Sequence, residues 1–105
     1  MVVYKKAIRD KIPEIIRESG GNCNVKKLSN EEFLLALEKK LTEEVKEYSE
    51  SKSVEELADI LEVITRISEL KDVSEDELEK IKKKKSQERG GFDDNLFLID
   101  SSEKF

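Results

Sequence analysis

Histidine is absent from this chain of 105 residues, and cysteine occurs once, at Cys23. Without histidine the chain has no Ser-His or Cys-His nucleophilic pair, no imidazole ligand for zinc and no histidine general base. A single cysteine forms no intrachain disulfide, which fits a reducing compartment. The sequence has no run of ~18 apolar residues, and its N-terminus has no apolar stretch of signal-peptide length. We therefore expect a cytoplasmic protein without a membrane partner.

Aromatic residues are also scarce, at 6%, whereas charged residues make up 43% of the chain and hydrophobic residues 36%. The net charge of −5 argues against a nucleic-acid partner, because neutralising phosphates requires a basic surface. The length predicts a single domain over residues 1–105 with a modest core. A larger core requires partners, so we expect a homodimer or a higher homo-oligomer.

Glycine and proline, which break helices, are rare: the chain has four glycines and one proline. The glycines form two pairs, Gly20-Gly21 and Gly90-Gly91, and each pair follows a charged, helix-favouring stretch, as helix stop signals do. A short helix is expected to be capped by Asp10, to carry Pro13 in its first turn and to end at Gly20.

Ser-x-x-Glu capping boxes predict the starts of three longer helices. In such a box, the serine and glutamate side chains accept hydrogen bonds from backbone N–H groups at the start of the helix. The boxes are Ser29/Glu32, Ser53/Glu56 and Ser74/Glu77, and the helices are expected over residues 30–50, 53–71 and 75–89. Residues 21–28 are expected to form a loop, and the tail 92–105 a short strand or a packed arm around apolar residues 96–99. The sequence predicts an all-α fold, a small bundle of about four helices.

The helix expected over residues 30–50 carries a carboxylate within its apolar face. On a wheel of about 100° per residue, an apolar arc around Leu37 contains Phe33, Leu34, Leu41, Val45 and Tyr48. Glu44 falls inside this arc, Glu47 and Lys40 fall at its edge, and Glu43 points well away. A core-facing arc normally excludes carboxylates, because burying an unpaired charge is unfavourable.

The helix expected over residues 53–71 repeats the pattern. Its broad apolar face contains Leu57, Ile60, Leu61, Val63, Ile64 and Ile67. Glu56 falls between Val63 and Ile67 on the wheel, and Asp59 falls at the edge of the face, next to Arg66. The outward face takes Glu55, Glu62 and Glu69.

Each of these helices thus presents two carboxylates spaced three residues apart, which places both side chains on one helical face. The pairs are Glu44 with Glu47, and Glu56 with Asp59. If the helices are antiparallel neighbours, four anions converge, and a hard divalent cation is the natural way to neutralise them. A site with only oxygen ligands suits Mg²⁺ or Mn²⁺.

Two simpler interpretations of these carboxylates remain open. In the first, Glu56 is the capping partner of Ser53. In the second, Glu44 and Glu47 form ion pairs with lysines such as Lys40 on a solvated helix face. The chain would then be a non-enzymatic helical oligomerisation module. That alternative accounts for the amphipathic helices and the charge content, but not for carboxylates on both apolar arcs.

The two acidic motifs resemble those of a known family. Residues 43–47, EEVKE, match E-E-x-x-E, and residues 56–59, ELAD, match E-x-x-D. Together with KKAIRDKIPEII near the N-terminus and QERGGF near the C-terminus, they resemble the MazG-like all-α nucleotide pyrophosphohydrolases, and within them the small house-cleaning branch. The resemblance runs roughly from Lys5 to Phe92, most of the chain.

The resemblance implies a helical, oligomeric hydrolase that binds Mg²⁺ through its acidic motifs. Such an enzyme cleaves a nucleoside triphosphate between the α- and β-phosphates and releases a monophosphate and pyrophosphate, for example to remove modified nucleotides. Carried over by position, the metal ligands are Glu44, Glu47, Glu56 and Asp59. Glu43 is a further acidic residue of the first motif.

The remaining site residues follow from the needs of phosphoanhydride hydrolysis. Glu44 or Glu47 would accept a proton from the attacking water. The cations expected to hold the phosphates are Arg9, Lys11, Lys40 and Arg89, of which Lys11 also fits a solvated surface charge. Phe92 and Tyr48 are expected to pack in the core, with base stacking as the alternative. Residues 82–85, four lysines, are expected to form a solvated helix face.

The sequence departs from the family pattern in two places. Eight residues separate Glu47 from Glu56, which predicts a tight connection between the two helices. Asp59 is followed by Ile60, where phosphoribosyl-ATP pyrophosphohydrolases often have a Tyr-His pair. The assignment to histidine biosynthesis is therefore the alternative rather than the first choice.

Overall fold

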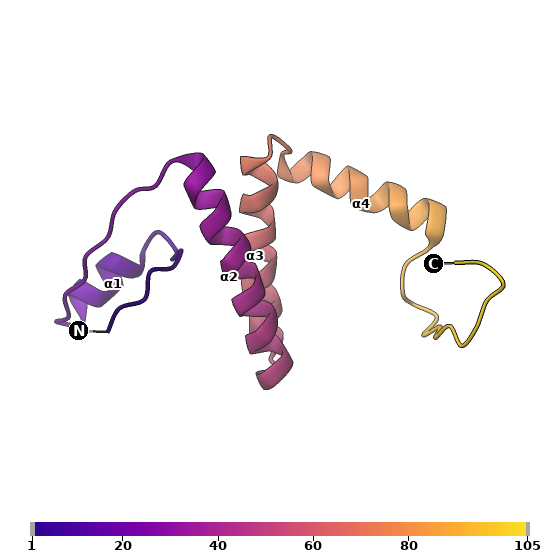
Figure 1. The fold of residues 1–105 in the computed structure, drawn as a ribbon, viewed down its shortest axis with the longest axis horizontal. Coiled ribbons are helices and arrows are strands. Elements are labelled where there is room, and N and C mark those ends of the chain that lie inside the picture. Colours follow the sequence, from indigo (N-terminus) through magenta and orange to yellow (C-terminus); the bar gives the residue numbers. More distant parts are fainter. Residues whose placement is uncertain (1, 105) are drawn as a thin grey trace. The chain divides into compact units, whose positions relative to one another are not determined.

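The computed structural model describes residues 2–104, and in this range it contains four helices and no strand. The helices are α1 (Ile12–Glu18), α2 (Asn30–Ser51), α3 (Val54–Leu70) and α4 (Glu75–Arg89), which Figure 1 shows along the chain. The all-α fold predicted from the sequence is confirmed. Within the described residues, no helix combines the length and the apolar composition needed to cross a membrane.

The chain divides into two compact units, the first ending at Glu75 and the second beginning at Asp76. The first unit contains α1, α2 and α3, and the second contains the rest of α4 and the tail. The single domain predicted over residues 1–105 stays a prediction.

Helices α2 and α3 form the packed centre of the first unit. Only Lys52 and Ser53 separate them, so the chain reverses direction and the two helices lie side by side (Figure 1). Lys52 takes a left-handed backbone conformation with φ of 59°, which ends α2. The tight connection and the antiparallel arrangement expected from the sequence are therefore present.

The first capping box forms as predicted. The N–H of Glu32 donates to Ser29 Oγ at 3.1 Å, and the N–H of Ser29 donates to Glu32 Oε1 at 3.2 Å. The bond from the Ser29 backbone favours the charged carboxylate and lowers the pKa of Glu32. The predicted Ser53/Glu56 box does not form, because Ser53 Oγ accepts instead from the N–H of Glu55 at 3.3 Å.

Both predicted glycine stops are confirmed. Gly20 and Gly90 have φ of 90° and 84°, values that side chains with a Cβ rarely adopt. The start of α1 differs from the prediction: Lys11, and not Asp10, is the N-cap residue, and no side chain caps the helix. Pro13 lies in the first turn, where its missing N–H removes no helical hydrogen bond, and this sets where the helix begins.

The core of the first unit is small and joins three segments. Its buried members are Ala7 from the N-terminal segment, Leu37 from α2 and Val63 from α3. Partly buried residues pack around them: Phe33, Ala36, Leu41, Ile67 and Leu70. Part of the predicted apolar face of α3 stays exposed, with Leu57 at 41% and Leu61 at 64%.

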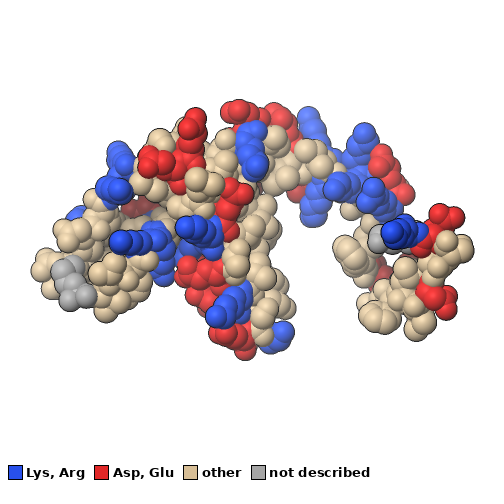
Figure 2. Space-filling view, viewed as in Figure 1, with Lys and Arg blue, Asp and Glu red and all other residues tan. Residues whose placement is uncertain are grey.

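The second unit buries little apolar surface of its own. Helix α4 has no buried residue, and its basic side chains, including residues 82–85, gather along it in Figure 2. The predicted strand or packed arm is wrong for the described tail, because the apolar residues 96–99 are exposed and form no strand. Phe92 is fully exposed, so the expected core packing of this ring is also wrong.

Candidate metal centre

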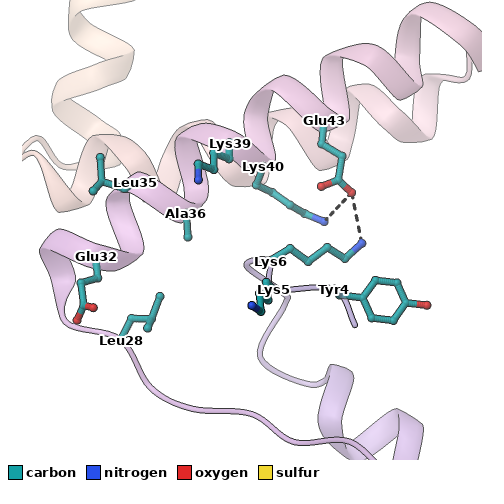
Figure 3. A pocket seen from close by; sticks show the side chains of 10 residues that line it. All are labelled: Tyr4, Lys5, Lys6, Leu28, Glu32, Leu35, Ala36, Lys39, Lys40 and Glu43. Atoms are coloured by element: carbon teal, nitrogen blue, oxygen red, sulfur yellow. Dashed lines mark hydrogen bonds and ion pairs between the residues drawn. The ribbon is translucent and has the colours of Figure 1, made fainter. Parts of the chain in front are cut away.

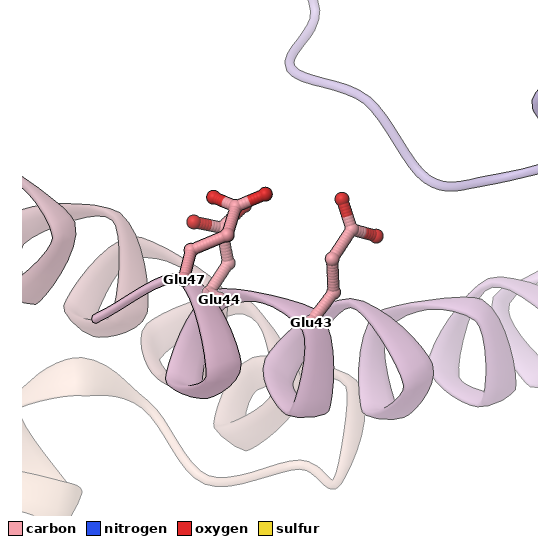
Figure 4. Close-up of side chains that lie close together, drawn as sticks. All are labelled: Glu43, Glu44 and Glu47. Atoms are coloured by element: carbon pink, nitrogen blue, oxygen red, sulfur yellow. The ribbon is translucent and has the colours of Figure 1, made fainter. Parts of the chain in front are cut away.

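Two overlapping groups of carboxylates lie where α2 packs against α3. Glu43, Glu44 and Glu47 each place one oxygen within 4.8 Å of the others (Figure 4). Glu44 also approaches Glu56 and Asp59 of α3 within the same limit. The four carboxylates predicted to converge therefore belong to two groups that share Glu44.

Glu43 lies closer to this centre than the helical wheel predicted. It rises from the same side of α2 as Glu44 and Glu47 in Figure 4. The wheel places only the Cβ atom, whereas the flexible glutamate side chain reaches toward two lysines. Lys6 Nζ lies 3.3 Å and Lys40 Nζ lies 3.9 Å from Glu43 Oε1. The prediction that Glu43 points well away is thus wrong for its carboxylate.

Glu44 is the buried member of the centre, with 5% of its surface exposed. Its Oε1 forms an ion pair with Lys40 Nζ at 3.1 Å. Its Oε2 is buried and has no hydrogen-bond partner among the described residues. The predicted pairing with Lys40 is present, but on a buried face rather than a solvated one. Because a buried carboxylate oxygen without a partner is unfavourable, Glu44 retains unused capacity to bind a cation.

Glu56 presents a second oxygen of this kind. Its Oε2 is buried without a hydrogen-bond partner in the described part of the chain. Burial raises the pKa of Glu56, and the negative charges of Glu47, Glu44 and Asp59 raise it further. In the absence of a metal ion, the folded protein therefore binds a proton on Glu56 more tightly than the unfolded chain does. A divalent cation would compete with that proton.

We expect the Glu56→Gln variant to be more stable than the wild type in chelator at neutral pH. Above the raised pKa, the folded wild type carries an unfavourable charge that the amide removes. The wild type should gain stability as pH falls through the raised pKa toward 4.5, since the folded state then binds more protons than the unfolded state. Thermal unfolding in chelator across this pH range measures the difference between the two proteins.

The matched control for this pH dependence is Glu62→Gln, an exposed carboxylate on the same helix. It should change neither the unfolding temperature nor its pH dependence appreciably. A Glu56→Gln protein that is less stable than the wild type in chelator at neutral pH would show that the charge of Glu56 does not destabilise the folded state.

The N-terminal segment brings two cations to the carboxylates. Ala7 is buried against α2 and α3, and this anchors the residues on either side of it. Lys6 reaches Glu43 on α2, while Arg9 Nη2 donates to Asp59 Oδ1 on α3 at 2.7 Å. The prediction singled out Arg9 but missed Lys6. The feature of the sequence that could have pointed to Lys6 is its position next to Ala7, a small apolar residue within KKAIRDK.

The centre keeps a negative charge after all its ion pairs are formed. Its five carboxylates face three cations in the described residues: Lys6, Arg9 and Lys40. Two negative charges remain uncompensated when every group is ionised. One divalent cation would balance them, and carboxylate oxygens are the ligands that Mg²⁺ and Mn²⁺ prefer.

The carboxylate groups and their ion pairs do not include the other residues singled out from the sequence. Lys11 is the exposed N-cap of α1 and makes no ion pair within residues 2–104, which fits a solvated surface charge. Arg89 is the exposed last residue of α4, in the second unit. Tyr48 is half-buried, and Lys52 Nζ lies 5.8 Å from the centre of its ring.

Comparison with known proteins adds one partial match. No family model and no solved structure matches the chain. An uncharacterized protein of Mycolicibacterium smegmatis is 50% identical to it over 40 residues. These residues make up 38% of this chain and 41% of that protein, so the match spans less than half of either. The resemblance to the MazG-like family stays a prediction.

Proposed function

We propose that this protein is a divalent-cation-dependent nucleoside triphosphate pyrophosphohydrolase. It would cleave between the α- and β-phosphates and release a nucleoside monophosphate and pyrophosphate. The observation that carries the proposal is the carboxylate of Glu44, buried between two helices and shared by two groups of acidic side chains. Lys40 contacts only one oxygen of this carboxylate, and the other is buried without a hydrogen-bond partner in the described residues, which a purely structural ion pair does not explain.

The donor set fits a hard cation. The unpartnered oxygens of Glu44 and Glu56 are buried, and all the surrounding ligand atoms are carboxylate oxygens. Glu44, Glu47, Glu56 and Asp59 would hold Mg²⁺ or Mn²⁺. When bound, the ion lowers the pKa of a coordinated water and neutralises phosphate charge.

The side chains of the centre suggest a division of roles. Glu47 is exposed, so its carboxylate is accessible to accept the proton of the attacking water. Arg9 and Lys40 are charged donors at the edge of the acidic groups and would contact phosphate oxygens. The water oxygen forms a new bond to the α-phosphorus, and the bond from that phosphorus to the bridging oxygen breaks. The electron pair of that bond leaves with pyrophosphate, so no protein nucleophile is needed.

A homodimer or a higher oligomer is part of the proposal. Val54, Leu57 and Leu61 are exposed and recur at helical spacing on α3. An exposed apolar row of this kind is typical of a surface that packs against a second subunit. The same row supports the rival function, a non-enzymatic oligomerisation module that needs no metal.

Pyrophosphate release from a panel of ordinary and modified nucleoside triphosphates tests the proposal. The reaction is run with Mg²⁺ and with chelator, for the wild type and for Glu47→Gln and Asp59→Asn. We expect metal-dependent formation of equal amounts of monophosphate and pyrophosphate, largely lost in both variants because each removes a ligand or the base.

The exposed carboxylate of Glu38 on α2 offers a matched control, since Glu38→Gln removes one charge outside the centre. This variant should retain wild-type activity. A folded wild type that releases no pyrophosphate from any nucleotide and whose melting temperature does not respond to Mg²⁺ would favour the oligomerisation module.

A further inference from the structure

A lysine-rich pocket adjoins the carboxylates. It has a volume of about 480 Å³ and lies between the N-terminal segment and α2 (Figure 3). Four lysines line it, Lys5, Lys6, Lys39 and Lys40, together with two carboxylates, Glu32 and Glu43, so cations outnumber anions in the lining by two. The volume lies within the range of small-molecule sites. The pocket therefore has both the size and the charge to hold a small anion.

The four lysines differ in how they are paired. Lys6 and Lys40 both contact Glu43 at the edge of the pocket, as the dashed lines in Figure 3 show. Neither Lys5 nor Lys39 makes an ion pair within the part of the chain that the structure describes. Their two ammonium groups are thus available to an incoming anion.

The backbone at Lys5 adds a second sign of a built pocket. Lys5 has a φ of 49°, in the left-handed region that residues with a Cβ rarely adopt. Strained conformations of this kind cluster at ligand sites, where the surrounding structure holds them in place. Here the buried Ala7, two residues later, anchors the segment against α2 and α3.

We propose that this pocket binds the β- and γ-phosphates of the substrate, the part that leaves as pyrophosphate. This assignment rests on the proposed function. Lys40 connects the two sites, because it lines the pocket while its Nζ lies 3.1 Å from Glu44 Oε1. A polyphosphate in the pocket therefore has one end beside the carboxylates, where the α-phosphate would react. Lysine ammonium groups bind phosphate oxygens as charged hydrogen-bond donors.

The charged groups of this pocket would contact phosphates and not the base. Binding should therefore weaken as the number of phosphates falls, so that a nucleoside triphosphate binds more tightly than the corresponding monophosphate. Pyrophosphate should act as a competitive product inhibitor.

Calorimetric titration of the full chain with inorganic pyrophosphate in chelator and low salt tests the pocket without hydrolysis. The variant is Lys5→Gln/Lys39→Gln, and the matched control is Lys46→Gln/Lys71→Gln, which removes two exposed lysines outside the pocket. We expect the dissociation constant for pyrophosphate to rise at least about tenfold in the pocket variant, because each lost charged contact contributes appreciably to binding. The control should bind as the wild type does. Sulfate should bind more weakly than pyrophosphate to the wild type.

Three results would overturn the assignment: no binding of pyrophosphate to the wild type, equal binding to the pocket variant, or equal binding of sulfate. Nucleotide hydrolysis without pocket-dependent pyrophosphate binding would reject the pocket alone. Pocket-dependent binding without hydrolysis of any nucleotide would reject the proposed function and leave an anion site.

Discussion

Replacing Glu44 with glutamine is expected to abolish the stabilisation of the protein by Mg²⁺ and to lower nucleotide hydrolysis at least about 100-fold. Glu44 belongs to both carboxylate groups, so replacing its carboxylate with an amide weakens cation binding by either group. The wild type should gain about 2.7 kcal/mol of stability when Mg²⁺ is present at 100 times its dissociation constant. Thermal unfolding with Mg²⁺ and with chelator measures this gain, and the pyrophosphate assay measures the activity.

The control is again Glu38→Gln, which changes an exposed carboxylate on the same helix. It should keep both the Mg²⁺-dependent stabilisation and the activity. A Glu44→Gln protein that is stabilised by Mg²⁺ as strongly as the wild type would show that the ion binds elsewhere, if it binds at all. The centre between α2 and α3 would then have to be abandoned as the metal site.

Replacing Leu37 with alanine should destabilise the first unit by about 2–5 kcal/mol. Leu37 is 6% exposed and packs with Ala7 and Val63 in the small core. The truncated side chain loses its packing against two other segments, the N-terminal segment and α3, and leaves a cavity. A small domain has only about 5–15 kcal/mol of stability in total. Urea denaturation followed by circular dichroism measures the change.

Leu35→Ala is the matched control for this core substitution. Leu35 is on the same helix but 65% exposed, so its loss should change stability by only about 0.5 kcal/mol. Comparable losses in the two variants would mean that the small core does not dominate the stability of α2 and α3. The stability would then come from surfaces that the isolated chain leaves exposed.

The helices were predictable because their boundaries depend on local interactions. The prediction of a helix over 30–50 agrees with α2 at Asn30–Ser51, since Ser29 supplies the cap and satisfies free N–H groups within one turn. The stops at Gly20 and Gly90 are equally local, because each requires only a residue that tolerates positive φ. The Ser53/Glu56 box did not form, because Ser53 Oγ accepts from the N–H of Glu55 instead. The side chain of Glu56 lies near Glu44 and Asp59, a position that local spacing does not encode.

The candidate centre was predictable only in part. Helical periodicity identified Glu44 as a carboxylate on a packing face, and the structure buries it there. Periodicity could not identify the cations opposite, because the contacts of Lys6 with Glu43 and of Arg9 with Asp59 join residues 37 and 50 positions apart. The segment that carries these cations has no regular structure, so no repeat in the sequence indicates which way its side chains point.

In the tail, an apolar sequence pattern predicted structure that did not form. Its apolar residues 96–99 suggested a strand or a packed arm, yet they are exposed in the second unit. A strand needs a partner for its backbone hydrogen bonds, and an arm needs an apolar surface to cover. An apolar run alone specifies neither of these partners.

The sequence by itself determined the helical class, the start of α2, the helix stops at Gly20 and Gly90, and the carboxylates on the faces of α2 and α3. These features depend on contacts within a few residues, on the 3.6-residue period and on the conformational range of glycine. Only the tertiary structure decided that α2 and α3 bring these carboxylates together, that Ala7 anchors Lys6 and Arg9 beside them, and that four lysines share one pocket. Those juxtapositions join residues distant along the chain, and they form only when the packing of the small core brings the segments into contact.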